Sequence, residues 1–228
     1  MILNKKYTYL NPKRITDPET GNRTYSLFNE KLPSVTTILK HVPDEQKRIA
    51  LERWRQKVGD NEANKIRDNA AKRGTIMHRI LEGAIKEEGH ADLSQLGQEA
   101  GTMAQAILDN GFLEDLQEVY GMEMMLGYEG LYAGAADVVG VYKDRECIID
   151  FKQSNNPKKL HHCRDYFNQA AAYAMAHNDM YGTKIGAGVI LISVHGGGIQ
   201  EFVLKDKEFQ QYCWNWLRKV DEYYRLFK

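Results

Sequence analysis

The sequence is short of cysteine and has no long apolar run, and each shortage excludes a class of protein. Its three cysteines form no Cys-x-x-Cys pair, which argues against a disulfide framework and fits a reducing compartment. The longest strongly apolar run, Gly188 to Val194, is far shorter than the ~20 residues of a membrane-spanning helix. The N-terminus also lacks a signal-peptide pattern. We therefore expect a cytoplasmic protein, in a bacterium or a phage-infected host cell, with no membrane partner.

The chain has the composition of an ordinary folded domain. Its residues are 43% hydrophobic and 27% charged, which is enough apolar content for a sizeable core. A length of 228 residues is too short for two large independent domains. We expect a single domain over residues 1–228, divided into a β-hairpin appendage at 1–40, a helical region at 41–110 and an α/β core at 118–228.

The net charge is zero, but the charges are segregated along the chain. Residues 1–80 carry 17 basic and 9 acidic side chains, residues 81–150 carry 3 and 15, and residues 151–228 carry 11 and 7. Solvated helix faces of opposite sign would explain this pattern. A metal-dependent enzyme that acts on a polyanion would explain it equally well, because carboxylates would hold the ion while Lys and Arg hold phosphates.

Residue periodicity predicts a helical first half and a β-rich second half. The first 40 residues indicate a hairpin, with β-rich segments at 7–10 and 24–28 around a turn at 17–21. Helices are predicted at 44–58, 62–86, 94–110, 164–178 and from 206, and strands at 122–126, 132–141, 146–152, 188–194 and 199–204. This order is typical of helices packed on a mixed central β-sheet, an α/β (α+β) fold.

The segments around Asp137 and Asp150 carry the strongest chemical signal. On adjacent antiparallel strands the two carboxylates can lie side by side and hold one divalent cation such as Mg²⁺. Lys152 follows Asp150 by two residues, so both side chains point to one face and the ammonium can position a water beside the metal. The Phe151 side chain then points into the core, while its backbone carbonyl is available as a further ligand. Metal-dependent phosphodiester hydrolysis requires such groups.

A structural interpretation of the same residues has to be weighed against this one. An Asp-x-Lys pair on a strand is more often a surface ion pair than a catalytic site. Here, however, Ile148 and Ile149 place the Asp150 carboxylate at the end of an apolar strand. An unpaired charge is costly in such a position, so a cationic partner or a metal ion is expected there.

Four segments together resemble the PD-(D/E)XK nuclease superfamily. They run from Arg73 to Glu82, from Tyr132 to Asp137, from Ile149 to Ser154 and from Gln169 to Tyr173. Their residues and order are similar to those of its RecB-type exonuclease branch, and to the mitochondrial genome maintenance exonucleases and their phage relatives. The resemblance implies a restriction-endonuclease-like core, in which helices flank a mixed sheet, with a helical arch over the site. This chain has Ala136 in place of the proline in the superfamily name.

The resemblance also implies roles for individual residues. The expected catalytic residues are Lys152, Asp150 and Asp137. The expected metal ligands are His78, Asp137, Asp150, Glu123 and the carbonyl of Phe151. The candidates for substrate binding are Gln169, Tyr173, Ser154, Lys158, Lys159 and Arg73. His78 would otherwise be a packed helix histidine, and Gln169 with Tyr173 would otherwise support a contact between helix and sheet. The expected cofactor is Mg²⁺ or Mn²⁺; an iron–sulfur cluster is excluded, because members that hold one use four cysteines.

These residues predict a metal-dependent deoxyribonuclease. The favoured activity is that of an exonuclease on single-stranded DNA or DNA ends, in replication, recombination or repair. DNA with a free end is then the main partner, and a recombination or replication protein is a second. A structure-specific endonuclease on the same fold and a non-catalytic DNA-binding recombination module are the alternatives. The intact Asp/Asp/Lys set argues against the module, because a DNA binder has no use for carboxylates beside phosphates without a cation.

Overall fold

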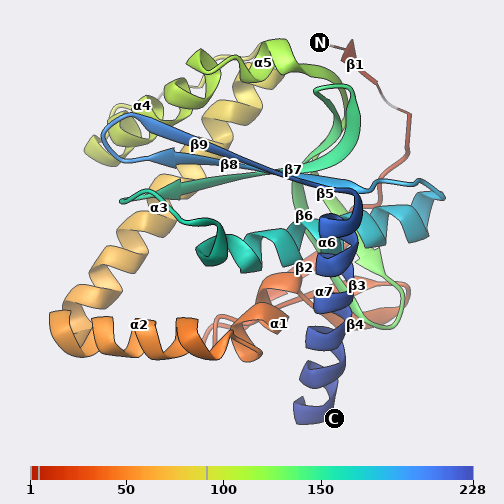
Figure 1. The fold of residues 1–228 in the computed structure, drawn as a ribbon, viewed down its shortest axis with the longest axis horizontal. Coiled ribbons are helices and arrows are strands. Elements are labelled where there is room, and N and C mark those ends of the chain that lie inside the picture. Colours follow the sequence, from red (N-terminus) through yellow and green to blue (C-terminus); the bar gives the residue numbers. More distant parts are fainter. Residues whose placement is uncertain (1, 5, 91, 228) are drawn as a thin grey trace.

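A six-stranded mixed β-sheet forms the centre of the molecule (Figure 1). The computed structural model of the protein describes residues 2–4, 6–90 and 92–227. The strands lie in the spatial order β1-β5-β6-β7-β8-β9. Their bounds are Ile2–Leu3, Leu116–Tyr128, Tyr132–Tyr142, Arg145–Ser154, Ala187–Val194 and Gly198–Lys205. Neighbouring strands are antiparallel, except for the parallel pairs β1–β5 and β7–β8.

Helices cover both faces of this sheet (Figure 1). Their bounds are Val35–His41 (α1), Glu45–Val58 (α2), Asp60–Ile85 (α3), Gln95–Asp109 (α4), Phe112–Asp115 (α5), Arg164–Tyr181 (α6) and Asp206–Phe227 (α7), with a short 3-10 turn η1 at Leu160–Cys163. One apolar core lies between the sheet and α1, α6 and α7, and a second lies between the sheet and α3, α4 and α5. Alternation along β7 serves both cores, because Ile148 joins the first and Ile149 the second.

Capping residues define where several helices begin and end. Ser34, Asp44 and Ser94 accept hydrogen bonds from backbone N–H groups in the first turns of α1, α2 and α4, and such caps stabilise a helix by about 1 kcal/mol. Helix α6 ends at Gly182, whose φ of 64° is the left-handed conformation that glycine adopts without strain. Helix α6 also returns the chain between β7 and β8, which a parallel strand pair requires.

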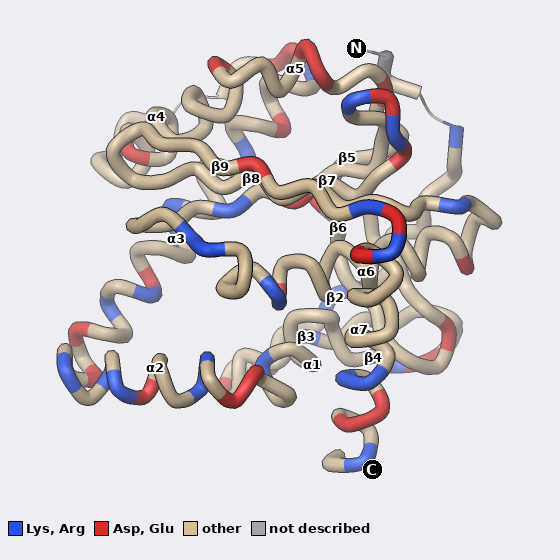
Figure 2. The backbone as a smooth tube through the Cα atoms, in the orientation of Figure 1, with Lys and Arg blue, Asp and Glu red and all other residues tan. Residues whose placement is uncertain are grey.

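Helix α2 lies outside both apolar cores. None of its described residues is buried, and charges of both signs alternate along it (Figure 2). It is tied to the start of α6 by ion pairs of Lys47 with Asp165 and of Arg164 with Asp44. The chain turns from α2 into α3 at Gly59, with a φ of 84°.

Residues 13–33 form a separate antiparallel sheet of three strands, β2 (Lys13–Thr16), β3 (Arg23–Leu27) and β4 (Glu30–Pro33). Its buried side chains Tyr25, Leu27 and Leu32 pack against Ala133 of β6. We call this unit the small sheet. It replaces the hairpin expected in this region: β3 lies where the second strand is predicted, but its partners are β2 and β4, and residues 7–10 are not in a strand.

Residues 7–10 hold the N-terminal segment against the core, because their aromatic rings pack on α6. The Tyr7 ring packs on His177 and Tyr181, at centroid distances of 5.0 and 5.4 Å. The Tyr9 hydroxyl lies 3.0 Å from His177 Nε2. The β-rich composition of this segment therefore reflects aromatic packing and not strand pairing.

The predicted fold class is confirmed, since helices flank a mixed central sheet. The strand bounds differ most at β5, predicted at 122–126 and observed at 116–128. Register shifts near residues 117 and 120 break the alternation of its side chains, and such bulges hide a strand from a period-2 pattern. None of the helices in residues 2–4, 6–90 and 92–227 is long and apolar enough to cross a membrane.

Candidate active site

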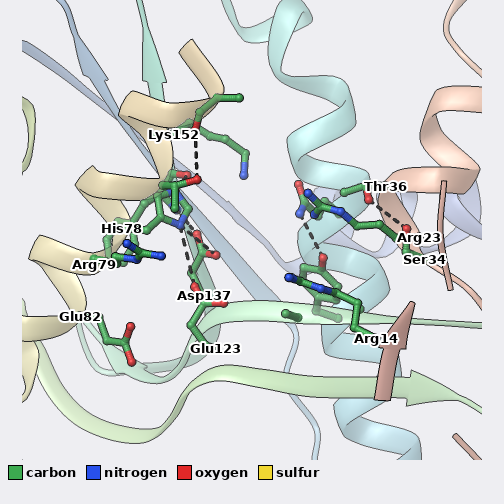
Figure 3. Close-up of a pocket in the computed structure, with 18 of the residues that line it drawn as sticks. Arg14, Arg23, Ser34, Thr36, His78, Arg79, Glu82, Glu123, Asp137 and Lys152 are labelled. Carbon is green, nitrogen blue, oxygen red and sulfur yellow. Dashed lines mark hydrogen bonds and ion pairs between the residues drawn. The ribbon is translucent and has the colours of Figure 1, made fainter. Parts of the chain in front are cut away.

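A cavity of about 620 Å³ lies where α3, the central sheet and the small sheet meet. Helix α3 forms one wall, β5, β6, β7 and α6 form the floor, and β2, β3 and the start of α1 form the far wall (Figure 3). The predicted site residues that line it are His78, Glu123, Asp137, Phe151, Lys152, Gln169 and Tyr173.

The strand register explains why acidic residues from three strands lie in one row. The β5–β6 pairs on either side, 122 with 138 and 124 with 136, place Glu123 opposite Asp137. The β6–β7 ladder ends at the pair 138 with 149, one step before Asp137 and Asp150. Residues directly opposite each other in antiparallel strands point to the same face, so the sheet itself gathers these carboxylates.

The strands β6 and β7 separate at Asp137. Beyond the end of their ladder, β6 remains paired with β5 and β7 with β8. The Asp137 carboxylate takes the place of the missing backbone partner, because its Oδ2 accepts a hydrogen bond of 2.8 Å from the N–H of Phe151. Burial alone would raise the pKa of the Asp137 carboxyl, but the charge and hydrogen bond of His78 outweigh it and lower that pKa. Asp137 is therefore held as a charged carboxylate.

His78 reaches the same point from α3. Its Nε2 lies 2.9 Å from the carbonyl oxygen of Phe151, and because a carbonyl can only accept, Nε2 carries the hydrogen. Its Nδ1 lies 3.5 Å from Asp137 Oδ1 and 4.0 Å from Glu123 Oε1. Burial alone would lower the pKa of the imidazole, but the charge of Asp137 outweighs it and raises that pKa. A backbone carbonyl that accepts from one ring nitrogen and so turns the other toward the ligand position, here beside Asp137 and Glu123, is the usual arrangement of a metal-binding histidine.

Asp150 and Lys152 form a buried ion pair. The Asp150 side chain is 1% exposed and that of Lys152 is 20% exposed. Burial raises the pKa of Asp150 to about 6, although the ammonium opposes this. Burial alone would lower the pKa of Lys152, but Asp150 and Asp137 outweigh it and raise that pKa, so Lys152 is an ammonium. Among the described residues Asp150 Oδ1 has no hydrogen-bond partner, and a buried carboxylate oxygen is costly unless a cation or water completes it.

Glu123 combines a strained backbone with a shifted pKa. Its φ is 52°, a left-handed conformation that costs a residue other than glycine roughly 1–3 kcal/mol and that, in the middle of a strand, is a form of strain that clusters at functional sites. Its side chain remains 48% exposed to the cavity. Burial of the remainder, together with the charge of Asp137, raises the pKa of Glu123 to about 7.

His78, Glu123 and Asp137 form the group best suited to a divalent metal ion. Each offers one ligand atom, and these atoms lie within 4.8 Å of one another. Two carboxylates and one imidazole suit Mg²⁺ or Mn²⁺. The other two expected ligands are adjacent but otherwise engaged, since Asp150 pairs with the neighbouring lysine and the Phe151 carbonyl accepts from His78.

Gln169 and Tyr173 lie together on the α6 side of the cavity. The side-chain amide of Gln169 donates to the Tyr173 hydroxyl at 3.1 Å. The Tyr173 ring is 3% exposed and lies against Gly134 of β6, where a Cβ would be only 2.8 Å from the ring. The pair therefore presents its polar ends to the cavity while it supports the contact between α6 and β6.

The remaining substrate-binding candidates have structural contacts or lie elsewhere. Arg73 is 8% exposed, and its guanidinium contacts the side chains of Gln153, Asn155 and Glu99. Ser154 is buried, and its hydroxyl donates to the carbonyl of the following turn at residue 156. Lys158 lines a second cavity of about 450 Å³ beside α2. Lys159 precedes η1, the turn that leads into α6.

Sequence reasoning missed the basic side of the main cavity. Arg14 of β2 and Arg23 of β3 line it across from His78 and Asp137, and Arg79 lies beside His78 on α3 (Figure 3). The excess of basic residues in 1–80 was the only signal for them. Their spacing carries no information, because they face the carboxylates only through the packing of the small sheet on β6.

Comparison with known proteins identifies similar sequences in three animals. The chain is 25% identical over 237 residues to mitochondrial genome maintenance exonuclease 1 of Homo sapiens, 25% over 217 residues to that of Mus musculus and 27% over 208 residues to that of Xenopus tropicalis. These matches cover 95%, 91% and 86% of this chain. The chain is similar to known exonucleases. The resemblance to mitochondrial genome maintenance exonucleases, predicted from its motifs, is thereby confirmed, in agreement with a PD-(D/E)XK-like nuclease.

The similarity to these exonucleases does not extend over their whole length. The aligned regions span 66%, 63% and 58% of the human, mouse and frog proteins. No family model matches the chain. Among solved structures, a candidate exonuclease from Eubacterium rectale superposes with a TM-score of 0.46 at 15% sequence identity, over 68% of this chain and 64% of that one.

Proposed function

We propose that the protein is a DNA exonuclease that depends on Mg²⁺ or Mn²⁺. The observation that carries the proposal is the convergence of His78, Glu123 and Asp137 on one point of a cavity that also contains Lys152. The named exonucleases to which the chain is similar support the same reaction class. Of the RecB-type site residues, Asp137, Asp150 and Lys152 are proposed as catalytic.

The protein's own groups would orient the reactants. His78 would bind the metal through Nδ1, because the Phe151 carbonyl holds Nε2 as the N–H. Glu123 and Asp137 would supply carboxylate oxygens. The other two expected ligands, Asp150 and the Phe151 carbonyl, would support this group from beside it, through their contacts with Lys152 and His78. A bound divalent cation would stabilise charge on the phosphate and lower the pKa of a coordinated water. Lys152, as an ammonium paired with Asp150, would donate a hydrogen bond that positions the attacking water.

The substrate side of the proposal follows from the cavity and the resemblance. Gln169 and Tyr173 would contact the DNA strand, with Ser154, Lys158, Lys159 and Arg73 as the more remote candidates. Helices α2 and α3 would form the arch that favours a single strand or a free end. The three cysteines are free thiols, in keeping with work in a reducing cytoplasm on replication, recombination or repair intermediates.

A substrate comparison tests this function. A linear single strand of DNA labelled at one end should be shortened by the purified protein in Mg²⁺ or Mn²⁺ and should remain intact in EDTA. A circular single strand of the same sequence should remain intact in all conditions. Cleavage of the circle would establish the endonuclease alternative. The non-catalytic module would be established if the protein binds DNA, leaves both the linear and the circular strand intact, and gives no calorimetric signal for binding of Mg²⁺ or Mn²⁺.

A further inference from the structure

The small sheet presents two arginines on the face that borders the cavity. Arg14 of β2 pairs in register with Tyr25 of β3, so their side chains share one face of the small sheet. Arg23 precedes Tyr25 by two residues on the same strand and therefore points the same way. Figure 3 shows the guanidinium groups of Arg14 and Arg23 directed into the cavity, across from His78 and Asp137.

The two guanidinium groups lie close enough to act on one hydroxyl. Tyr25 is 3% exposed, and burial raises the pKa of its hydroxyl, while the positive charges of Arg14 and Arg23 oppose that rise. Two like charges near one buried group repel each other, which is unfavourable unless an anion lies between them. The small sheet therefore carries a built concentration of positive charge at the rim of the cavity.

These charges have no direct ion-pair partner within the part of the chain that the structure describes, although the charge of Arg14 opposes the rise in the pKa of Glu123. Of the acidic side chains that line the cavity, Glu123 and Asp137 lie beside His78. Glu82 pairs with Lys86, the C-cap residue of α3. Neither Arg14 nor Arg23 forms an ion pair with a described residue. Both arginines are exposed. Arginine binds phosphate through parallel N–H donors, a geometry that lysine lacks.

We propose that Arg14 and Arg23 form a phosphate clamp, which holds the sugar–phosphate backbone of the nucleic-acid strand against the far wall of the cavity. The proposal rests on the proposed function and adds a binding site to it. The carboxylates on the floor repel phosphates wherever no cation lies between them, so a strand that crosses this cavity needs a positive surface opposite the metal-binding group. Contacts to phosphate carry no sequence information, so the clamp acts on every sequence alike.

The test measures binding without cleavage. Fluorescence anisotropy of a labelled single-stranded oligothymidylate would be recorded in Mg²⁺ with protein that carries Lys152→Ala, at several salt concentrations between 50 and 200 mM (about the range over which phosphate contacts dominate). Adding Arg14→Gln and Arg23→Gln should weaken binding at least tenfold. It should also reduce the slope of log K against log salt by about 1.4, since each phosphate contact to a single strand contributes about 0.7.

The opposite face of the small sheet supplies a matched control. Lys13, Ser26 and Lys31 lie in one register row on that face, and both lysines are exposed. The double variant Lys13→Gln with Lys31→Gln removes the same charge from the same sheet and should leave affinity and salt slope unchanged. Thermal unfolding of each protein would verify that the small sheet is still folded.

The outcomes separate the clamp from the function on which it rests. An unchanged salt slope in the Arg14 and Arg23 double variant, or an equal loss in the lysine control, would overturn the clamp alone. Arg14→Lys with Arg23→Lys should recover most of the salt slope but only part of the affinity, because the charge returns without the paired donors. Absence of salt-dependent DNA binding when both arginines are intact would overturn the proposed function, and the clamp with it.

Discussion

The backbone of Phe151 organises the candidate active site at the scale of single residues. Its N–H donates to Asp137 and its carbonyl accepts from His78, so one residue of β7 fixes the orientation of side chains from β6 and α3. The Phe151 ring is 3% exposed and packs edge-on against Phe112 at a centroid distance of 5.3 Å. The positions of the His78 and Asp137 side chains therefore depend on the apolar packing beneath them.

Lys152 provides the clearest residue-scale prediction. Lys152→Ala removes the ammonium that would position the attacking water, and we expect kcat to fall by about 10²–10⁴-fold, the range typical of such groups. Affinity for single-stranded DNA should change little, because the side chain is mostly buried beside Asp150. Steady-state kinetics and anisotropy on the same preparation measure both quantities.

Two controls accompany the Lys152 variant. Lys205→Ala removes an exposed lysine of β9 and should leave kcat unchanged. Thermal unfolding should detect the cost of leaving Asp150 without its cation, which for a buried pair reaches roughly 3–5 kcal/mol. A folded Lys152→Ala protein with at least a tenth of the normal kcat would contradict the role assigned to this lysine.

At the scale of elements, β6 tolerates little change. It carries Asp137, and it approaches α6 and β5 so closely that there is no room for a side chain at two of its glycines. A Cβ at Gly134 would lie 2.8 Å from the Tyr173 ring, and a Cβ at Gly140 would lie 2.2 Å from the backbone oxygen of Glu118 in β5. The second contact is with backbone, so a rotamer change cannot relieve it.

Gly140→Ala is therefore expected to lower the free energy of unfolding by about 1–3 kcal/mol, the usual cost of overpacking a core. Gly101→Ala in α4 is the matched comparison, because nothing lies within 4 Å of its would-be Cβ. Removing a glycine from a helix should raise the free energy of unfolding by about 0.5–1 kcal/mol. Urea unfolding of the three proteins measures both effects, and equal values for the two variants would contradict the packing described for β6.

The element scale also shows which features a sequence can reveal. Helix and strand periods predicted α3, α6, β7 and β8 because each buries a face of regular spacing against the large cores. Strand β5 was predicted too short because its bulges break that spacing. In the site, Asp137, Asp150 and Lys152 stood out because their spacing along adjacent strands is local information. Arg14 and Arg23 did not, because only the docking of the small sheet brings them to the cavity.

At the scale of the whole molecule, a buried histidine helps to hold the N-terminal segment on the core. His177 of α6 is 0% exposed. Its Nε2 lies 3.0 Å from the Tyr9 hydroxyl and its Nδ1 lies 2.8 Å from Thr183 Oγ1. Burial lowers the pKa of His177 to about 4 from the ordinary value of 6.5, so the folded protein holds it neutral.

This lowered pKa predicts a loss of stability in acid. Between pH 6.5 and about 4 the unfolded chain binds a proton at His177 that the folded chain does not, so the free energy of unfolding falls as pH falls. The loss reaches roughly 3 kcal/mol, at about 1.4 kcal/mol for each pH unit of the shift. Urea unfolding at pH values from 7.5 to 4.5 (about the window in which His177 matters) would measure it.

The variant His177→Gln isolates this contribution from that of the carboxylates. It should be less stable than the natural protein at neutral pH, because two buried hydrogen bonds are altered, but its stability should depend less steeply on pH. Parallel stability curves for the two proteins over the whole range would show that His177 is not the group responsible.

The two sides of the cavity come from different parts of the chain. The contribution of the small sheet to the cavity comes from one contiguous stretch, residues 13–33, whereas the metal-binding group draws on α3, β5 and β6. The stretch rests on β6 mainly through Tyr25, Leu27 and Leu32. A transplant of this segment that keeps those three anchors is therefore expected to replace the proposed phosphate clamp while leaving the His78, Glu123 and Asp137 group unchanged.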